Sequence, residues 1–84
     1  MELLICFEST HQALYMEKVL KFHNIDFDII PTPREITSSC GLSIKADDNA
    51  LDSILRLIED KNLEILGIYK ITKNEGKVLY EKMR

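Results

Sequence analysis

Cys40 is the residue whose surroundings suggest chemistry, because it lies between two serines and a glycine in the stretch TSSCGLS. A cysteine acts as a nucleophile when its environment favours the thiolate over the thiol. Gly41 lacks a Cβ, which leaves room for a substrate near the sulfur and permits an unusual backbone. Ser38 and Ser39 can donate hydrogen bonds to a thiolate, or can simply shape a turn. Cys40 therefore has two interpretations: a reactive thiol, or a small buried residue at the start of a strand.

Four other polar residues can support that sulfur. Ser9, Thr10 and His11 lie where a helical pattern begins, and the N-terminus of a helix favours an anion such as a thiolate. His11 can transfer a proton beside Cys40, and Arg34 can supply positive charge; an idle surface histidine and a solvated loop arginine are the alternatives. A metal site would have only Cys40 and His11, fewer than the three or four ligands of stable sites. We therefore expect neither a metal nor a cofactor.

The second cysteine, Cys6, alternates with apolar residues in the run ELLICFE, which predicts an inert buried thiol. No CxxC pair is present, which argues against a dithiol oxidoreductase. No nucleophile elbow with Ser, His and Asp in order suggests a hydrolase. Turnover of a small molecule is therefore not expected.

The elements that must position these residues follow one another in the order β-α-β-β-α-β. Strands are predicted over residues 2–8, 25–31, 41–46 and 63–71, and helices over residues 9–24 and 47–62. Ser9 serves as N-cap of the first helix with Gln12 as its capping-box partner, and Asp47 or Asp48 caps the second. The third strand alternates Ser43 with apolar residues, which predicts one face in water. This order is the α+β, ferredoxin-like split βαβ fold, an antiparallel sheet with two helices on one face.

With right-handed crossovers and the sheet order 4-1-3-2, the loop 31–40 and the start of the first helix meet at one edge of the sheet. Cys40 is then expected in an exposed loop beside residues 9–11. The tail, residues 72–84, has a turn signal near residue 75 and predicts an extra C-terminal strand, with a short helix as the alternative. One domain is expected over residues 1–84, with a core over 2–71 and an extension over 72–84.

Composition narrows the classes of partner. The 84 residues carry a net charge of −3 with scattered lysines and arginines, which disfavours nucleic acid. No apolar run is long enough to span a membrane, and the N-terminus lacks the features of a signal peptide. We expect a cytoplasmic protein whose two cysteines remain thiols.

Apolar residues on the side of the sheet away from the helices predict a homodimer. Leu4 and Cys6 on the first strand, with Leu66 and Ile68 on the last, are expected to form one exposed patch on adjacent strands. A small monomer rarely leaves such a patch in water, and a twofold axis makes it self-complementary.

Three segments in order, FESTHQAL, PTPREITSSCGLSI and GIYKI, resemble the selenium/sulfur carrier-like family. The resemblance covers roughly residues 3–71. It implies that Cys40 carries sulfur or selenium as a persulfide or selenosulfide, passed from a donor protein, for which a cysteine desulfurase is one candidate, to an acceptor protein. The alternative is a non-catalytic module that binds a protein or an anionic metabolite through the Pro-Arg loop, with Cys40 in a structural role.

Overall fold

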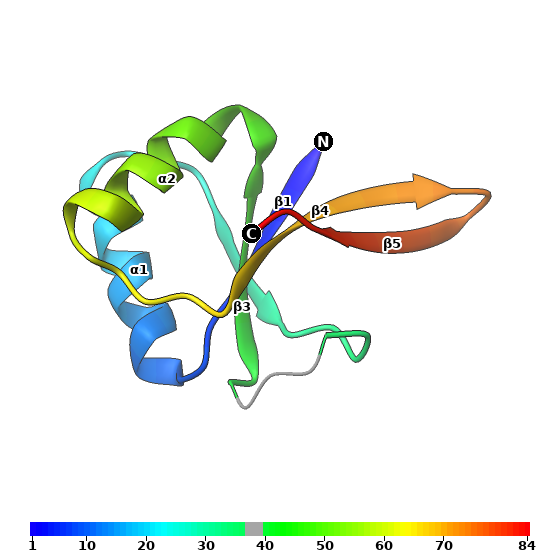
Figure 1. Cartoon of the computed structure of the whole chain (residues 1–84), viewed down its shortest axis with the longest axis horizontal. Helices are drawn as coiled ribbons and strands as arrows, with labels where there is room; N and C mark the ends of the chain where they lie inside the picture. The colour runs from blue at the N-terminus through cyan, green and yellow to red at the C-terminus, as the bar shows by residue number, and fades with distance from the viewer. Residues whose placement is uncertain (37–39) are drawn as a thin grey trace.

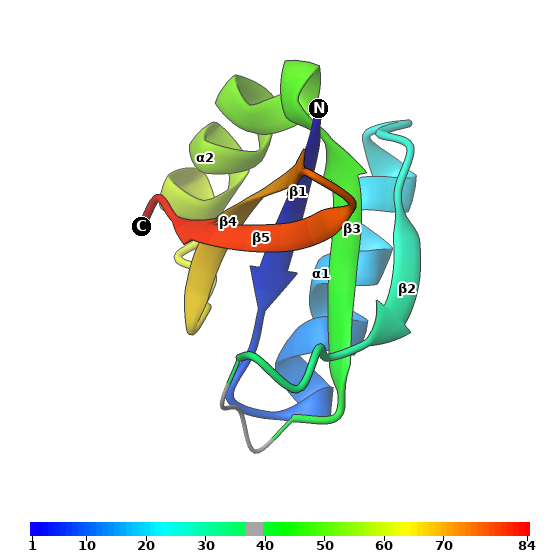
Figure 2. The same cartoon turned by 90° about the vertical axis from the view of Figure 1, so that its right-hand side faces the viewer.

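The computed structural model describes residues 1–36 and 40–84 and has the predicted order of elements, with one strand added. The strands are β1 (Glu2–Cys6), β2 (Asp28–Pro31), β3 (Leu42–Asp47), β4 (Gly67–Asn74) and β5 (Lys77–Lys82); the helices are α1 (Thr10–Phe22), the short 3₁₀ helix η1 (Asp48–Ala50) and α2 (Leu51–Asp60). The sheet is antiparallel with the order β2-β3-β1-β4-β5. Both helices cover one face of it (Figures 1 and 2). The ferredoxin-like α+β prediction and the predicted return strand are confirmed.

Ser9 begins α1 as predicted, and this cap fixes the end of the helix that faces the cysteine loop. Ser9 has an extended backbone, and its hydroxyl oxygen accepts the N–H of Gln12 at 3.3 Å. The Gln12 side chain accepts the N–H of Glu8 at 3.1 Å, one residue before the position of a standard capping box. Two backbone donors at the start of α1 are therefore satisfied locally.

Asp47 is the cap of the second helical segment, as predicted. Its carboxylate accepts the N–H of Asn49 at 2.9 Å, and this hydrogen bond lowers the pKa of Asp47 below its ordinary value. The same residue ends β3, so a single side chain marks the change from strand to helix.

The main core lies between the helices and the sheet. Its fully buried members come from β1, α1, β3, α2, β4 and the segments next to β1 and β3: Ile5, Phe7, Ala13, Met16, Leu20, Cys40, Ile44, Ile54 and Ile68. On α1 the buried positions recur every three or four residues, so one stripe of that helix faces the sheet. This packing holds the start of α1 against the sheet edge where β3 begins.

The opposite face of the sheet is covered from within the chain. Ile36, in the loop after β2, is 7% exposed and packs against Leu4 and Cys6, which are both fully buried. Tyr80 of β5 and Ile30 of β2 pack against the same cluster. The sequence-based expectation that Leu4 and Cys6 lie on an exposed patch is therefore wrong, because the loop folds back over them.

The last element of that predicted patch is also misplaced. The strand predicted over 63–71 begins at Gly67, where Ile68 pairs with Ile5 and enters the helix-side core. Leu66, just before the strand, packs on the other side, so the expected alternation from Leu66 to Ile68 is broken. A Cβ on Gly67 would lie 3.0 Å from the carbonyl oxygen of Arg84, so the C-terminal backbone approaches closely at this point.

Ser43 of β3 corrects a further prediction. The side of β3 that carries Ser43 was expected to face water, yet Ser43 is completely buried. Thr32, directly after β2, lies over it, and the two hydroxyl oxygens are 2.8 Å apart. A buried hydroxyl requires such a partner, and period-two alternation in one strand cannot reveal it.

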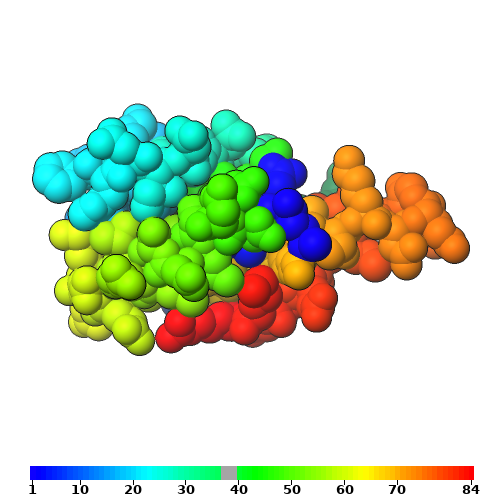
Figure 3. Space-filling view, turned by 90° about the horizontal axis from the view of Figure 1, so that it is seen from above, coloured from blue at the N-terminus to red at the C-terminus, as the bar shows by residue number. Residues whose placement is uncertain are grey.

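The β4–β5 hairpin extends beyond the rest of the sheet (Figures 1 and 3). The last β1–β4 pair is Glu2 with Ile71, so the hairpin arm, defined here as residues 72–79, has no β1 strand beside it. Within residues 1–36 and 40–84, no helix is long and apolar enough to cross a membrane.

Candidate functional site around Cys40

Cys40 lies two residues before the start of β3 and belongs to the helix-side core, with 1% of its surface exposed. The expected position in an exposed loop is therefore wrong. The loop is held to the sheet on both sides of the cysteine: Ile36 packs on the far face, and the N–H of Thr32 donates to the carbonyl of Gly41 at 3.0 Å. These two anchors bring the segment down onto the sheet and leave Cys40 beneath the surface.

The sulfur of Cys40 has polar contacts as well as apolar ones. Its Sγ accepts the N–H of Leu42 at 3.4 Å and lies 3.3 Å from the Leu42 carbonyl oxygen, to which the thiol donates. It lies 3.9 Å from the hydroxyl oxygen of Thr10 in the first turn of α1. The expectation that Cys40 lies beside the start of α1 is confirmed through Thr10.

A chain of hydroxyl groups connects the two cysteine segments. Thr32 donates from its hydroxyl to the Cys40 carbonyl at 3.0 Å, and its oxygen is 2.8 Å from that of Ser43. Ser43 in turn donates to the sulfur of Cys6 at 3.6 Å. The sequence analysis missed Thr32 and Ser43. Thr32 lies in the PTPRE turn. Its hydroxyl, a hydrogen-bonding group close to the cysteine loop, was the only feature of the sequence that pointed to it.

Cys6 occupies a different environment from Cys40. It lies inside β1, paired with Ser43 of β3 and Gly67 of β4, and none of its surface is exposed. Burial raises the pKa of the Cys6 thiol above its ordinary value, and only part of that effect is opposed by the hydrogen bond from Ser43. Cys6 is a buried thiol, as the sequence predicted, with a polar partner that the sequence did not predict.

Of the other residues predicted to support the sulfur, Gly41 and Arg34 lie at the surface. Gly41 is exposed, and its φ lies outside the left-handed region, so the unusual backbone that a glycine permits is not adopted here. A Cβ at this position would meet open space. Arg34 is exposed in a turn closed by the Ile36 N–H and the Pro33 carbonyl. Ser38 and Ser39 lie outside the described residues.

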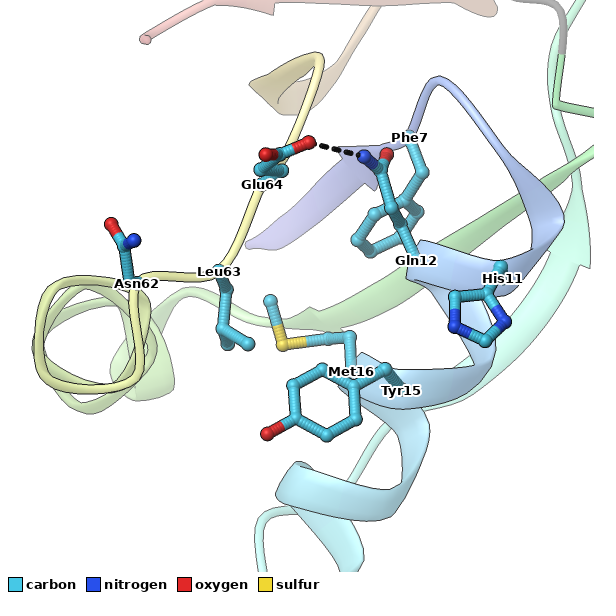
Figure 4. Close-up of a pocket in the computed structure, with 8 residues that line it drawn as sticks. All are labelled: Phe7, His11, Gln12, Tyr15, Met16, Asn62, Leu63 and Glu64. Carbon is cyan, nitrogen blue, oxygen red and sulfur yellow. Dashed lines mark hydrogen bonds between the residues drawn. The ribbon is translucent and has the colours of Figure 1, made fainter.

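His11 is exposed and lines a hollow of about 330 Å³ between the start of α1 and the segment after α2 (Figure 4). Across this hollow Gln12 donates to the carboxylate of Glu64 at 2.9 Å. Thr10, one residue earlier, lies with its hydroxyl oxygen 3.9 Å from the Cys40 sulfur. The structure therefore places Thr10 at the sulfur and His11 at the hollow.

In residues 1–36 and 40–84, no group of three or more His, Cys, Asp and Glu side chains is arranged to hold a metal ion. Neither Cys6 nor Cys40 is in a disulfide. The chemistry available at the site is therefore that of a cysteine sulfur held by a backbone amide and lying near a hydroxyl at a helix start.

The fold and the site define a class: a small antiparallel α+β protein with a hydrogen-bonded cysteine packed at the start of a helix. The chain belongs to the family described as "Putative Se/S carrier protein-like", which matches residues 2–70 and confirms the resemblance drawn from the sequence. No curated protein and no solved structure matches the chain.

Proposed function

We propose that this protein carries a sulfur or selenium atom on Cys40 between a donor protein and an acceptor protein. One observation supports the choice of cysteine more than any other: the Leu42 N–H donates to the Cys40 sulfur, with the Thr10 hydroxyl 3.9 Å away at the helix start. An amide donor at sulfur stabilises negative charge on it. The Cys6 sulfur accepts instead from the Ser43 hydroxyl at 3.6 Å, and burial raises the pKa of this thiol.

The proposed step is a transfer between sulfur atoms without net oxidation or reduction. The Cys40 thiolate attacks the terminal sulfur of a donor persulfide, a new S–S bond forms on Cys40, and the donor's S–S bond breaks. The donor leaves as a thiolate and takes up the proton that Cys40 released. An acceptor thiolate then attacks the terminal atom on Cys40, and Cys40 returns to its thiol form. A selenium cargo would follow the same sequence with a selenosulfide.

The burial of Cys40 adds a requirement to this proposal. A sulfur atom beneath the surface cannot be attacked in line by a group on another protein. The segment around Gly41 must therefore open when a partner docks. The contacts that must yield include those of Thr32, which donates to the carbonyls of both Cys40 and Gly41.

A cysteine desulfurase in the cytoplasm fits as the donor class. Such an enzyme presents a persulfide, which is the chemistry that the proposed step needs, and a reducing compartment keeps both thiols of this chain free. The acceptor is defined only as a protein thiolate or a comparable nucleophile.

The experiment is intact mass spectrometry of the full chain after incubation with a cysteine desulfurase and cysteine. We expect one added sulfur atom on the wild type, removed by a mild reductant and mapped to Cys40. Cys6→Ser is the matched control and should still be loaded, whereas Cys40→Ser should not. Since both variants carry the same change, a general effect of losing a thiol would appear in both.

Two outcomes would contradict the proposal. Loading of Cys40→Ser at the wild-type level would assign the cargo to Cys6. No loading of the wild type, with free cysteine thiols confirmed by alkylation after unfolding, would favour the interaction-module alternative, in which Cys40 is a core residue.

A further inference from the structure

The outer edge of β5 is the part of the sheet that no described segment covers. In the strand order β2-β3-β1-β4-β5, β5 has β4 on one side and no strand on the other. An edge strand presents unpaired N–H and C=O groups and is a template for a further strand. The hairpin arm, residues 72–79, projects from the body of the molecule, so the outer part of this edge is sterically accessible (Figure 3).

The two edges of the sheet are not equivalent. The edge at β2 has four residues and ends in Pro31, which has no N–H to donate to another strand. The edge at β5 has six residues, Lys77–Lys82, and no proline. It also exposes two large apolar side chains, with Val78 at 42% and Leu79 at 48%. Strand β5 is therefore the edge that is chemically suited to pair.

The charges along β5 identify a partner strand. Lys77 and Glu81 lie symmetrically about Leu79, two positions to either side, and share one face of the strand with it. If a second β5 pairs antiparallel with Leu79 opposite Leu79, each Lys77 faces a Glu81 of the other copy. On the other face, Val78 then lies opposite Tyr80, a β-branched residue against an aromatic one.

The neighbouring symmetric registers lack this complementarity. In a twofold antiparallel pair, two residues that lie opposite each other point to the same face of the sheet. The twofold axis therefore always passes beside one residue, which faces its own copy, and never between two residues. An axis at Val78 places Lys77 opposite Leu79, and one at Tyr80 places Leu79 opposite Glu81. Each of these sets a charge against an apolar side chain, whereas the axis at Leu79 does so at no position from 77 to 81.

We propose that this protein forms a twofold dimer by antiparallel pairing of β5 with β5 about Leu79, which joins two five-stranded sheets into one. The interface is isologous and closed, so it limits assembly to two copies. It replaces the face-to-face dimer expected from the sequence, whose apolar patch the chain itself covers. It is independent of the proposed role of Cys40. One short strand per copy makes a small interface, so the dimer should dissociate on dilution.

The test is analytical ultracentrifugation of the full chain over a wide concentration range, with a charge-swap series. The wild type should move from 9.7 kDa towards twice that mass as concentration rises. Lys77→Glu and Glu81→Lys should each weaken the dimer at least tenfold, because like charges then face each other. The double variant should recover most of the wild-type affinity, since the opposite charges are restored with their positions exchanged.

Glu81 also lies opposite Lys70 within the hairpin, so each variant needs a thermal melt to show that the hairpin is intact. A second experiment avoids charge altogether. Leu79→Cys should form a disulfide between two copies under mild oxidation, mapped by mass spectrometry to position 79 in both. The matched control is Val78→Cys, which lies opposite Tyr80 in this register and should form far less.

Three results would overturn the proposal. The first is a wild type that stays at 9.7 kDa up to near-millimolar concentration. The second is a dimer that neither single charge variant weakens, which would place the interface on another surface. The third is a double variant whose dimer affinity falls by as much as the two single changes combined, together with equal disulfide formation at positions 78 and 79. This result would exclude the register about Leu79.

Discussion

Replacing Ile36 by Ala tests whether the loop after β2 is the cover of the far face of the sheet. The side chain is 7% exposed and packs against Leu4 and Cys6. Ile36→Ala removes three carbon atoms, and at about 0.8 kcal/mol for each buried methylene this gives about 2.4 kcal/mol. A residual cavity would add to this figure and collapse of the loop would reduce it, so we expect a loss of about 2 to 3 kcal/mol. In a domain of this size the melting temperature falls by about 10 to 20 °C.

The assay is urea unfolding followed by circular dichroism, at a protein concentration low enough that the proposed dimer is dissociated. Ile36→Val should cost about 0.5 to 1.5 kcal/mol, because it removes a single methylene. Val78→Ala, at an exposed β-branched residue, is the matched control and should stay within about 0.5 kcal/mol. If Ile36→Ala lowers the free energy of unfolding by no more than the control does, the inference that Ile36 covers Leu4 and Cys6 is refuted.

Three further predictions concern the cap and the two thiols. Ser9→Ala should lower stability by about 1 kcal/mol in a thermal melt, while Ser53→Ala, at an exposed position inside α2, should change it less. Alkylation of the native protein followed by peptide mapping should modify Cys40 before Cys6, because Cys40 lies outside the strands whereas Cys6 lies beneath Ile36 and burial raises its pKa; the reverse order would count against Cys40 as the carrier. Stability should fall as the pH rises above about 9.0, since the unfolded chain then loses the Cys6 proton while the folded chain, with its raised pKa, retains it. Cys6→Ser should remove that part of the alkaline loss, and an unchanged profile would contradict the assignment.

The order of the elements was predictable because each carries its own local signal. Ser9 and Gln12 have the spacing of a helix start, and the alternation in residues 42–46 has the period of a strand. The position of Cys40 next to Thr10 followed from the topology of the split βαβ fold, since that topology brings the two loops to one edge.

The depth of the site was not predictable in the same way. Hydrophobic alternation reports which side chains share a face, but it does not report which loop covers that face. Ile36 lies in a turn-rich segment with no periodic pattern, so its packing over Cys6 has no local signal. The burial of Ser43 depends on Thr32, eleven residues earlier, and a pair at that separation appears only once the two strands are aligned.

Burial of Cys40 is compatible with a carrier because a bound sulfane sulfur is lost to any thiol that reaches it. A carrier must therefore hide its cargo between partners and expose it to each of them. Cys6 lies on the far face of the sheet beneath Ile36, so its sulfur is uncovered only when that packing is lost. Cys40 lies outside the strands, and its segment includes two hydrogen bonds from Thr32, at 3.0 Å each, that can break without separating any strands. We therefore expect a docking partner to uncover Cys40 by a local change that leaves the sheet intact, and to leave Cys6 covered as long as Ile36 stays packed on it.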